Sequence, residues 1–204
     1  MAEMTLLPST RLQSVNTMLR AVGESPISTL TDPFTDAQIA INLLEEVSRE
    51  VQSKGYRFNT ECDVTLSKGG DGTIPVSSNV LDARPHLKSK VRGEGNWALR
   101  GGFLYDLENH TNVFTASERA DIIYMLDWPD LTEPVRRYIT VRAARKFQED
   151  MLGSAEKGKF KDTDEADALR DFRRSDRRSR RANMFVDNIR LHNTTNRNTP
   201  NRSR

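Results

Sequence analysis

The sequence is poor in cysteine, aromatic residues and long apolar runs. Cys62 is the single cysteine in 204 residues, which excludes an internal disulfide framework and any zinc site built on several thiolates. Aromatic residues make up 7% of the chain and hydrophobic residues 36%, so the core is small. No stretch approaches the roughly 20 apolar residues of a membrane helix, and the first residues lack the features of a signal peptide. We therefore expect a soluble chain.

The sequence also lacks an excess of positive or negative charge. Lys and Arg total 31, Asp and Glu total 29, and the net charge is +2. A balance this close argues against a protein that binds polyanions over its whole surface. Any basic function must therefore be local.

Motifs that carry chemistry are scarce. None of His86, His110 and His192 has a second His or Cys at ligand spacing, so we expect surface or loop histidines, no metal site and no cofactor. The glycine-rich residues 69–72 are followed by a strand pattern, not by the Lys-Ser/Thr of a phosphate-binding loop, which indicates a turn. Cys62 also lies in a strand pattern, where no helix N-terminus or nearby base activates a thiol.

One pair of carboxylates keeps an enzymatic alternative open. Glu61 and Asp63 flank Cys62 and are expected to point to the same face of a strand. Two carboxylates are the catalytic groups of most glycosidases. The solvent-exposed face of an edge strand has the same pattern, and we favour that interpretation. We therefore expect no enzyme, with a glycan or peptidoglycan hydrolase as the alternative.

Apolar residues at helical spacing predict helices at both ends of the chain. Thr10 and Gln13 have the spacing of a capping box, and Gly23 follows where a left-handed residue ends a helix. Ile39 and Met151 are among the residues expected to be buried. The predicted helices cover residues 10–22, 35–54, 132–152 and 163–192, and the first two form an antiparallel pair.

The middle of the chain has strand patterns instead. Residues 64–66 and 74–76 flank the glycine-rich turn, and residues 122–126 form a further apolar strand. Residues 97–106 contain Gly-Gly between two short strands, which is typical of a hairpin with a primed turn. The fold class is therefore α+β: an antiparallel α-helical bundle with an inserted small antiparallel β-sheet domain. The expected divisions are N-terminal helices in 1–60, a β-rich domain in 61–130, C-terminal helices in 131–192 and a polar, extended tail in 193–204.

The most unusual feature is an arginine run in the last predicted helix. Its steps of three and four residues place the guanidinium groups on one face. Like charges at this spacing weaken an isolated helix, and an acidic partner surface or a phosphate backbone would offset that. A solvated basic helix is the plain alternative, and the few nearby aromatic residues do not support sequence-specific nucleic-acid binding. The candidate contacts with a partner protein or with DNA are Arg170, Arg173, Arg174, Arg177, Arg178 and Arg181.

Four segments together resemble the tail tubular protein A family of short-tailed phages. Residues 12–30 contain an apolar helix followed by Gly-Glu-Ser-Pro-Ile, and residues 51–61 contain Gln-Ser-Lys-Gly-Tyr-Arg-Phe-Asn. Residues 99–106 contain Arg-Gly-Gly-Phe-Leu-Tyr-Asp, and residues 133–147 begin with Glu-Pro-Val-Arg-Arg-Tyr. The resemblance runs from about residue 11 to 150 and leaves the arginine-rich helix outside it.

The resemblance implies a structural subunit of the virion tail, assembled in the host cytoplasm. Such a subunit forms a ring of about twelve copies that connects the portal to the nozzle and surrounds the DNA ejection channel. Its implied partners are the portal protein, the nozzle protein and, in many phages, the tail fibres, with genomic DNA passing through the ring and no membrane involved. For the arginine face we favour a portal contact, because guanidinium groups pair well with carboxylates.

Overall fold

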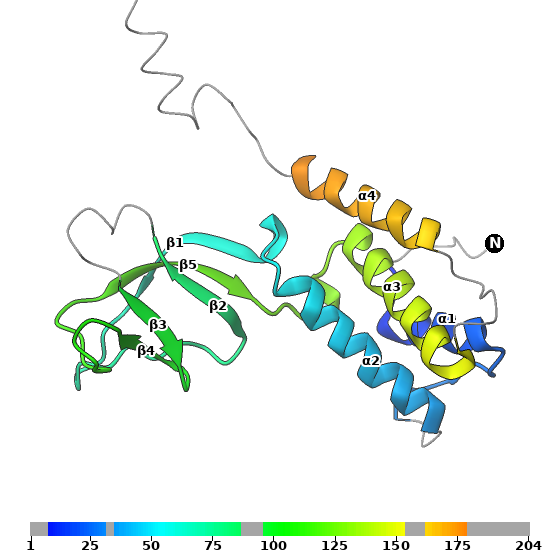
Figure 1. Cartoon of the computed structure of the whole chain (residues 1–204), viewed down its shortest axis with the longest axis horizontal. Coiled ribbons are helices and arrows are strands. Elements are labelled where there is room, and N and C mark those ends of the chain that lie inside the picture. Colours follow the sequence, from blue (N-terminus) through cyan, green and yellow to red (C-terminus); the bar gives the residue numbers. More distant parts are fainter. Residues whose placement is uncertain (1–7, 32–34, 87–95, 154–161, 179–204) are drawn as a thin grey trace, which may run out of the picture.

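The computed structural model describes residues 8–31, 35–86, 96–153 and 162–178, and it confirms the α+β fold class. Figure 1 shows the helices at one end of the molecule and the strands at the other. The helices are α1 (Arg11–Val22), α2 (Thr35–Gln52), α3 (Glu133–Leu152) and α4 (Asp162–Arg178). The predicted extension of the last helix to His192 and the tail from residue 193 lie outside the described residues.

Helix α1 begins and ends as its sequence predicts. The Thr10 hydroxyl accepts a hydrogen bond from the Gln13 backbone N–H at 3.2 Å, and the Gln13 side chain accepts one from the Thr10 N–H at 2.9 Å. Gly23 ends the helix with φ 88°. The side-chain amide of Asn16 then accepts a hydrogen bond from the Ile27 N–H at 2.8 Å and donates one to the Ile27 carbonyl at 3.0 Å. This amide fixes the return of the chain after α1.

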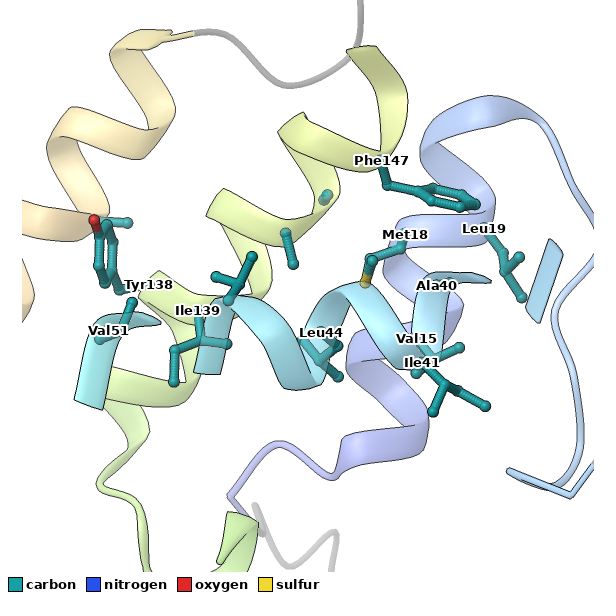
Figure 2. Packing of buried hydrophobic residues seen from close by; sticks show 14 of the residues in the cluster. Val15, Met18, Leu19, Ala40, Ile41, Leu44, Val51, Tyr138, Ile139 and Phe147 are labelled. Atoms are coloured by element: carbon teal, nitrogen blue, oxygen red, sulfur yellow. The ribbon is translucent and has the colours of Figure 1, made fainter. Parts of the chain in front are cut away.

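Helices α1, α2 and α3 enclose the larger core. Figure 2 shows Phe147 of α3 beside Met18 and Leu19 of α1, and Leu44 of α2 belongs to the same buried cluster. Ser14 of α1 contacts Thr140 of α3, and further along the same helices Ala21 contacts Gln148, so α1 and α3 run in the same direction. Helix α2 runs against both.

Two positions predicted to be buried in this core are exposed. Ile39 is 41% exposed, whereas Ile41 is 7% exposed and occupies a core position. The buried stripe of α2 contains Ala37, Ala40, Ile41 and Leu44, and at about 100° per residue Ile39 falls on its far side. Met151, 39% exposed, lies in the last turn of α3, beyond the core residue Phe147.

The β region has two small antiparallel sheets. The first has the strand order β1 (Thr60–Leu66), β5 (Glu118–Tyr124), β2 (Val80–Pro85), and the second is the hairpin of β3 (Trp97–Arg100) and β4 (Phe103–Asp106). The Gly-Gly turn of this hairpin has φ 58° and 82°, as predicted. A second, smaller core lies between the sheets, with buried side chains from each, among them Ile74, Trp97, Leu104, Ala120 and Ile122.

Residues 64–66 and 74–76, which flank the glycine-rich turn, do not pair with each other, and residues 74–76 form only an isolated bridge where a strand was predicted. Strand β1 pairs with β5 instead, over fifty residues later in the chain. Residues 74–76 run along β4, where Leu104 N–H donates to the Ile74 carbonyl at 3.0 Å and Val76 N–H donates to the Gly102 carbonyl at 2.8 Å. The glycine-rich residues 69–72 do form a turn. The pairing differs because β5, in which Ala120 and Ile122 are buried, lies at the centre of the sheet and pairs with both β1 and β2.

Two buried amides connect the helical region to the β region. Gln52 is fully buried, and its side chain accepts from the Leu126 N–H at 2.8 Å and donates to the Leu126 carbonyl at 3.1 Å. Asn59 donates to the carbonyls of Gln52 and Tyr124 at 2.9 and 2.8 Å. Because each buried amide has several partners, the junction between α2, β1 and β5 is closely specified.

Candidate partner-binding surface

Helix α4 packs on α3 through an aromatic cluster. Phe172 is 1% exposed. Its ring lies 5.7 Å from that of Tyr138 in a stacked arrangement and meets Tyr56 and Phe58 edge-on, with centroids 4.5 and 5.9 Å away. Ala168, one turn earlier, is 3% exposed. Aromatic pairs in these geometries stabilise beyond the apolar area that they bury, so these two residues position the whole helix.

An ionic network reinforces this packing. Glu165 of α4 accepts from Arg142 at 2.7 Å and from Arg145 at 2.6 Å, both on α3. The bond to Glu165 raises the pKa of Arg145. Glu50 of α2 binds Arg142 and Lys146; burial acts to raise the Glu50 pKa, but these two cations outweigh it and lower the pKa. The network therefore links α2, α3 and α4 by charged side chains.

The arginine face lies on the side of α4 away from this packing. The structure brings together five of the six predicted residues, all exposed on consecutive turns, and Arg181 lies outside the described residues. An open hollow in the surface runs along them, with Ala166 and Leu169 in its lining. The five residues are Arg170, Arg173, Arg174, Arg177 and Arg178.

The structure also explains how the helix tolerates this charge. Arg177 and Arg178 lie in the last turn, and Asp162 and Asp164 lie in the first. Both placements complement the helix dipole, since cations are favoured at the C-terminus and anions at the N-terminus. Together with the buried Phe172, they show that part of the stabilisation expected from a partner comes from the chain itself.

The predicted pairing of Glu61 and Asp63 on one face of β1 is wrong. A β-bulge lies between Glu61 and Val64, and Asp63 has φ 65°. Glu61 is opposite Ile122 of β5, whereas the Asp63 carboxylate forms an ion pair with Arg119 of β5 at 2.5 Å. Because neighbouring residues of β5 face opposite ways, the two carboxylates point to opposite faces of the sheet.

The histidines divide between a turn and a partly buried site. His110 is an exposed turn residue with φ 54°, as predicted. His86 follows β2, but its side chain is only 15% exposed and its Nδ1 lies 2.6 Å from Asp121. Burial acts to raise the Asp121 pKa, and the contacts with His86 and the Asp63 N–H outweigh it, so the pKa is lowered. His192 lies outside the described residues, and the described ones contain no cluster suited to a metal ion.

A buried arginine that was not predicted from the sequence anchors Ser9, just before α1. Arg136 is 7% exposed and donates to three backbone carbonyls, those of Leu131 at 2.8 Å, Pro129 at 2.7 Å and Ser9 at 3.0 Å. Glu133 accepts from the Ser9 N–H at 2.8 Å. An arginine in the first turn of a helix resembles a surface residue in the sequence, so only the tertiary structure identifies this role.

The segments that showed the family resemblance coincide with these fixed points. The return after α1, the Gln52–Asn59 junction, the Gly-Gly hairpin and the Arg136 anchor each fall in one of them. The model of the Tube family, described as tail tubular protein, matches residues 12–182. The chain belongs to this family. The match extends through α4, so the arginine-rich helix lies inside the family region. The resemblance read from the sequence ended at about residue 150 and had left this helix outside.

A curated relative agrees with this assignment. The chain is 27% identical over 146 residues to Tail tubular protein A of Klebsiella phage KP34. The aligned region covers 71% of this chain and 75% of that protein. This tail tubular protein is therefore a structural component of a phage tail and is located in the virion tail. No helix in the described part of the chain is long and apolar enough to cross a membrane.

Proposed function

We propose that this tail tubular protein is the subunit of an adaptor ring that joins the portal to the nozzle and surrounds the DNA ejection channel. The observation that carries the proposal is the family match over residues 12–182, with the matched segments at the fixed points of the fold. A ring of about twelve copies is expected, because a cyclic assembly repeats one heterologous contact until it closes.

The shape of the subunit supports a connecting role. Helices lie at one end and the β-hairpin at the other, so each end can meet a different neighbour (Figure 1). The Gln52 and Asn59 amides hold the two regions in one arrangement. Phe103 and Val113 of the β region are 41% and 54% exposed. We assign the β region to the nozzle and the tail fibres, and the helical region to the portal.

The arginine face is the proposed contact with a carboxylate-bearing protein surface, the portal above all. Guanidinium groups form paired hydrogen bonds with carboxylates. The DNA channel is the less favoured location, because Asp164, Asp167 and Asp171 are exposed on the same helix and would repel phosphates. Binding to duplex DNA would fall steeply as salt is raised and would ignore sequence.

Co-sedimentation with purified portal tests this assignment. The full chain should bind portal, and the pair Arg170→Ala and Arg174→Ala should weaken binding at least tenfold. Arg84→Ala is the matched control, since Arg84 is exposed on β2 and far from α4 in the fold. Unchanged portal binding in the α4 variant, with salt-dependent DNA binding lost instead, would move the arginine face to the DNA channel.

The hydrolase alternative has a direct test. Zymography on peptidoglycan and on capsular glycan should give no cleared band for the wild-type chain. If a band appears and Glu61→Gln or Asp63→Asn removes it, the protein is an enzyme. The bulge that separates these two carboxylates is the reason that we expect no such result.

A further inference from the structure

A second hollow in the surface lies where three elements of the helical region meet. These are the C-terminal part of α4, the start of α3 and the short 3₁₀ helix η1 (Arg57–Asn59), and the hollow has a volume of about 360 Å³. Phe58, Val135 and Phe172 form its apolar lining. Phe58 and Phe172 also belong to the aromatic cluster that holds α4, so an apolar group seated in the hollow extends that core and is removed from water.

Charged side chains of both signs line the same hollow. Asp130 lies just before α3, Asp176 lies near the end of α4, and Arg57 lies in η1. Asp130 and Arg57 are exposed. A complementary occupant therefore has an apolar centre, cations for the two carboxylates and an anion for the guanidinium group.

The sequence just after α4 has this composition. Arg180 and Arg181 come first, the apolar residues 184–186 (Met-Phe-Val) follow, and Asp187 comes next. All of them lie outside the described residues, so the match with the hollow is one of sequence chemistry.

A straight continuation of α4 would not bury this apolar group. Successive residues of an α-helix are rotated by about 100°, which places Met184 and Phe185 about 120° and about 140° around the helix from Phe172. Phe172 faces the core of the protein, so both side chains would lie on the solvent side. The apolar residues are removed from water only if the chain turns back.

The hollow is within reach of its own chain. Ser175 and Asp176 line it, and α4 ends at Arg178. At roughly 3.3 Å per residue, residues 180–187 extend about 7 to 30 Å beyond Arg178, which is enough to return across the hollow. A tethered segment also has an effective concentration in the millimolar range, which favours it over the same segment of a second copy.

We infer that residues 180–187 turn back after Arg178 and dock in this hollow of their own chain. The apolar residues of the segment contact the aromatic cluster, its arginines face the two carboxylates and its aspartate faces Arg57. This arrangement replaces the predicted extension of the last helix to residue 192, and it gives Arg181 a partner within the chain. Because η1 leads directly into β1, the polar residues that follow the segment then leave from the junction of the helical and β regions. The inference goes beyond the adaptor function and does not depend on it.

Disulfide trapping tests the docking in the full chain. Cys62→Ser removes the single cysteine, which is exposed. Thr132→Cys with Asn183→Cys then places one thiol at the hollow and one beside the apolar residues of the segment. Thr132 is exposed and its side chain makes no capping hydrogen bond, so α3 should tolerate the change. On mild oxidation this chain should form a disulfide within one molecule, at a rate that does not depend on protein concentration.

Two matched pairs of substitutions in the two-cysteine chain identify the segment. Phe185→Asp with Val186→Asp should slow the cross-link at least tenfold. Thr194→Asp with Thr195→Asp adds the same charge outside the segment and should leave the rate unchanged. Equal rates in the two variants, or no cross-link in the parent chain, would overturn the inference. A cross-link that forms only between molecules, and faster at higher concentration, would assign the hollow to a second copy and overturn it as well. None of these results depends on ring formation, so the adaptor function is tested separately.

Discussion

Replacing Phe172 by alanine should release the second half of α4 from the body of the protein. The Phe172 side chain is 1% exposed and contacts three other aromatic side chains. Loss of a buried phenylalanine costs about 3–5 kcal/mol in well-packed cores. The Glu165 network holds the first half of α4 independently. We therefore expect a loss of about 3 kcal/mol in the free energy of unfolding, near the lower end of that range.

Two measurements follow this change. Urea unfolding monitored by circular dichroism gives the loss in stability. Hydrogen exchange gives its location, and amides in the second half of α4, residues 170–178, should exchange much faster while those of α2 stay protected. Arg174→Ala is the matched control, because Arg174 is an exposed residue of the same helix. If Phe172→Ala resembled this control in both measurements, the aromatic cluster would not be what holds α4.

Three further changes test the junction between the two regions and the ionic network. Asn59→Ala should lower the free energy of unfolding by about 1–3 kcal/mol, because it removes the buried side-chain donor to the Gln52 and Tyr124 carbonyls; chemical denaturation measures this loss. Gly55→Ala should destabilise more than Gly102→Ala, since both residues have positive φ but only at Gly55 would the new Cβ lie 2.5 Å from Ile123; their melting temperatures make the comparison. Glu50 has a pKa below its usual 4.5, so its contribution to stability is complete above that pH and is lost as the pH falls through the lowered value; Glu50→Gln should therefore flatten stability against pH below about 4.5, and an unchanged acid profile would contradict this.

The local elements of this fold could be predicted because local chemistry specifies them. The Thr10 capping box and Gly23 define α1, and the Gly-Gly pair defines the β3–β4 hairpin, without reference to the rest of the chain. The stop at Gly153 follows the same principle, since its φ of 74° suits glycine.

Features that depend on distant partners could not be predicted in this way. Strand β1 has an ordinary strand pattern, but its pairing with β5 depends on which strand lies at the centre of the sheet. The bulge at Asp63 reverses a side chain that strict alternation placed beside Glu61. On α4, the spacing of the arginines predicted that they share one face, whereas the exposure of that face depends on Phe172, which packs against Tyr138 of α3.

The most direct test of the adaptor function is the assembly state of the purified full chain, alone and mixed with portal. Native mass spectrometry and negative-stain imaging should both give a closed ring of about twelve copies, formed alone or on the portal. A monomer at every concentration that ignores the portal would contradict the central claim.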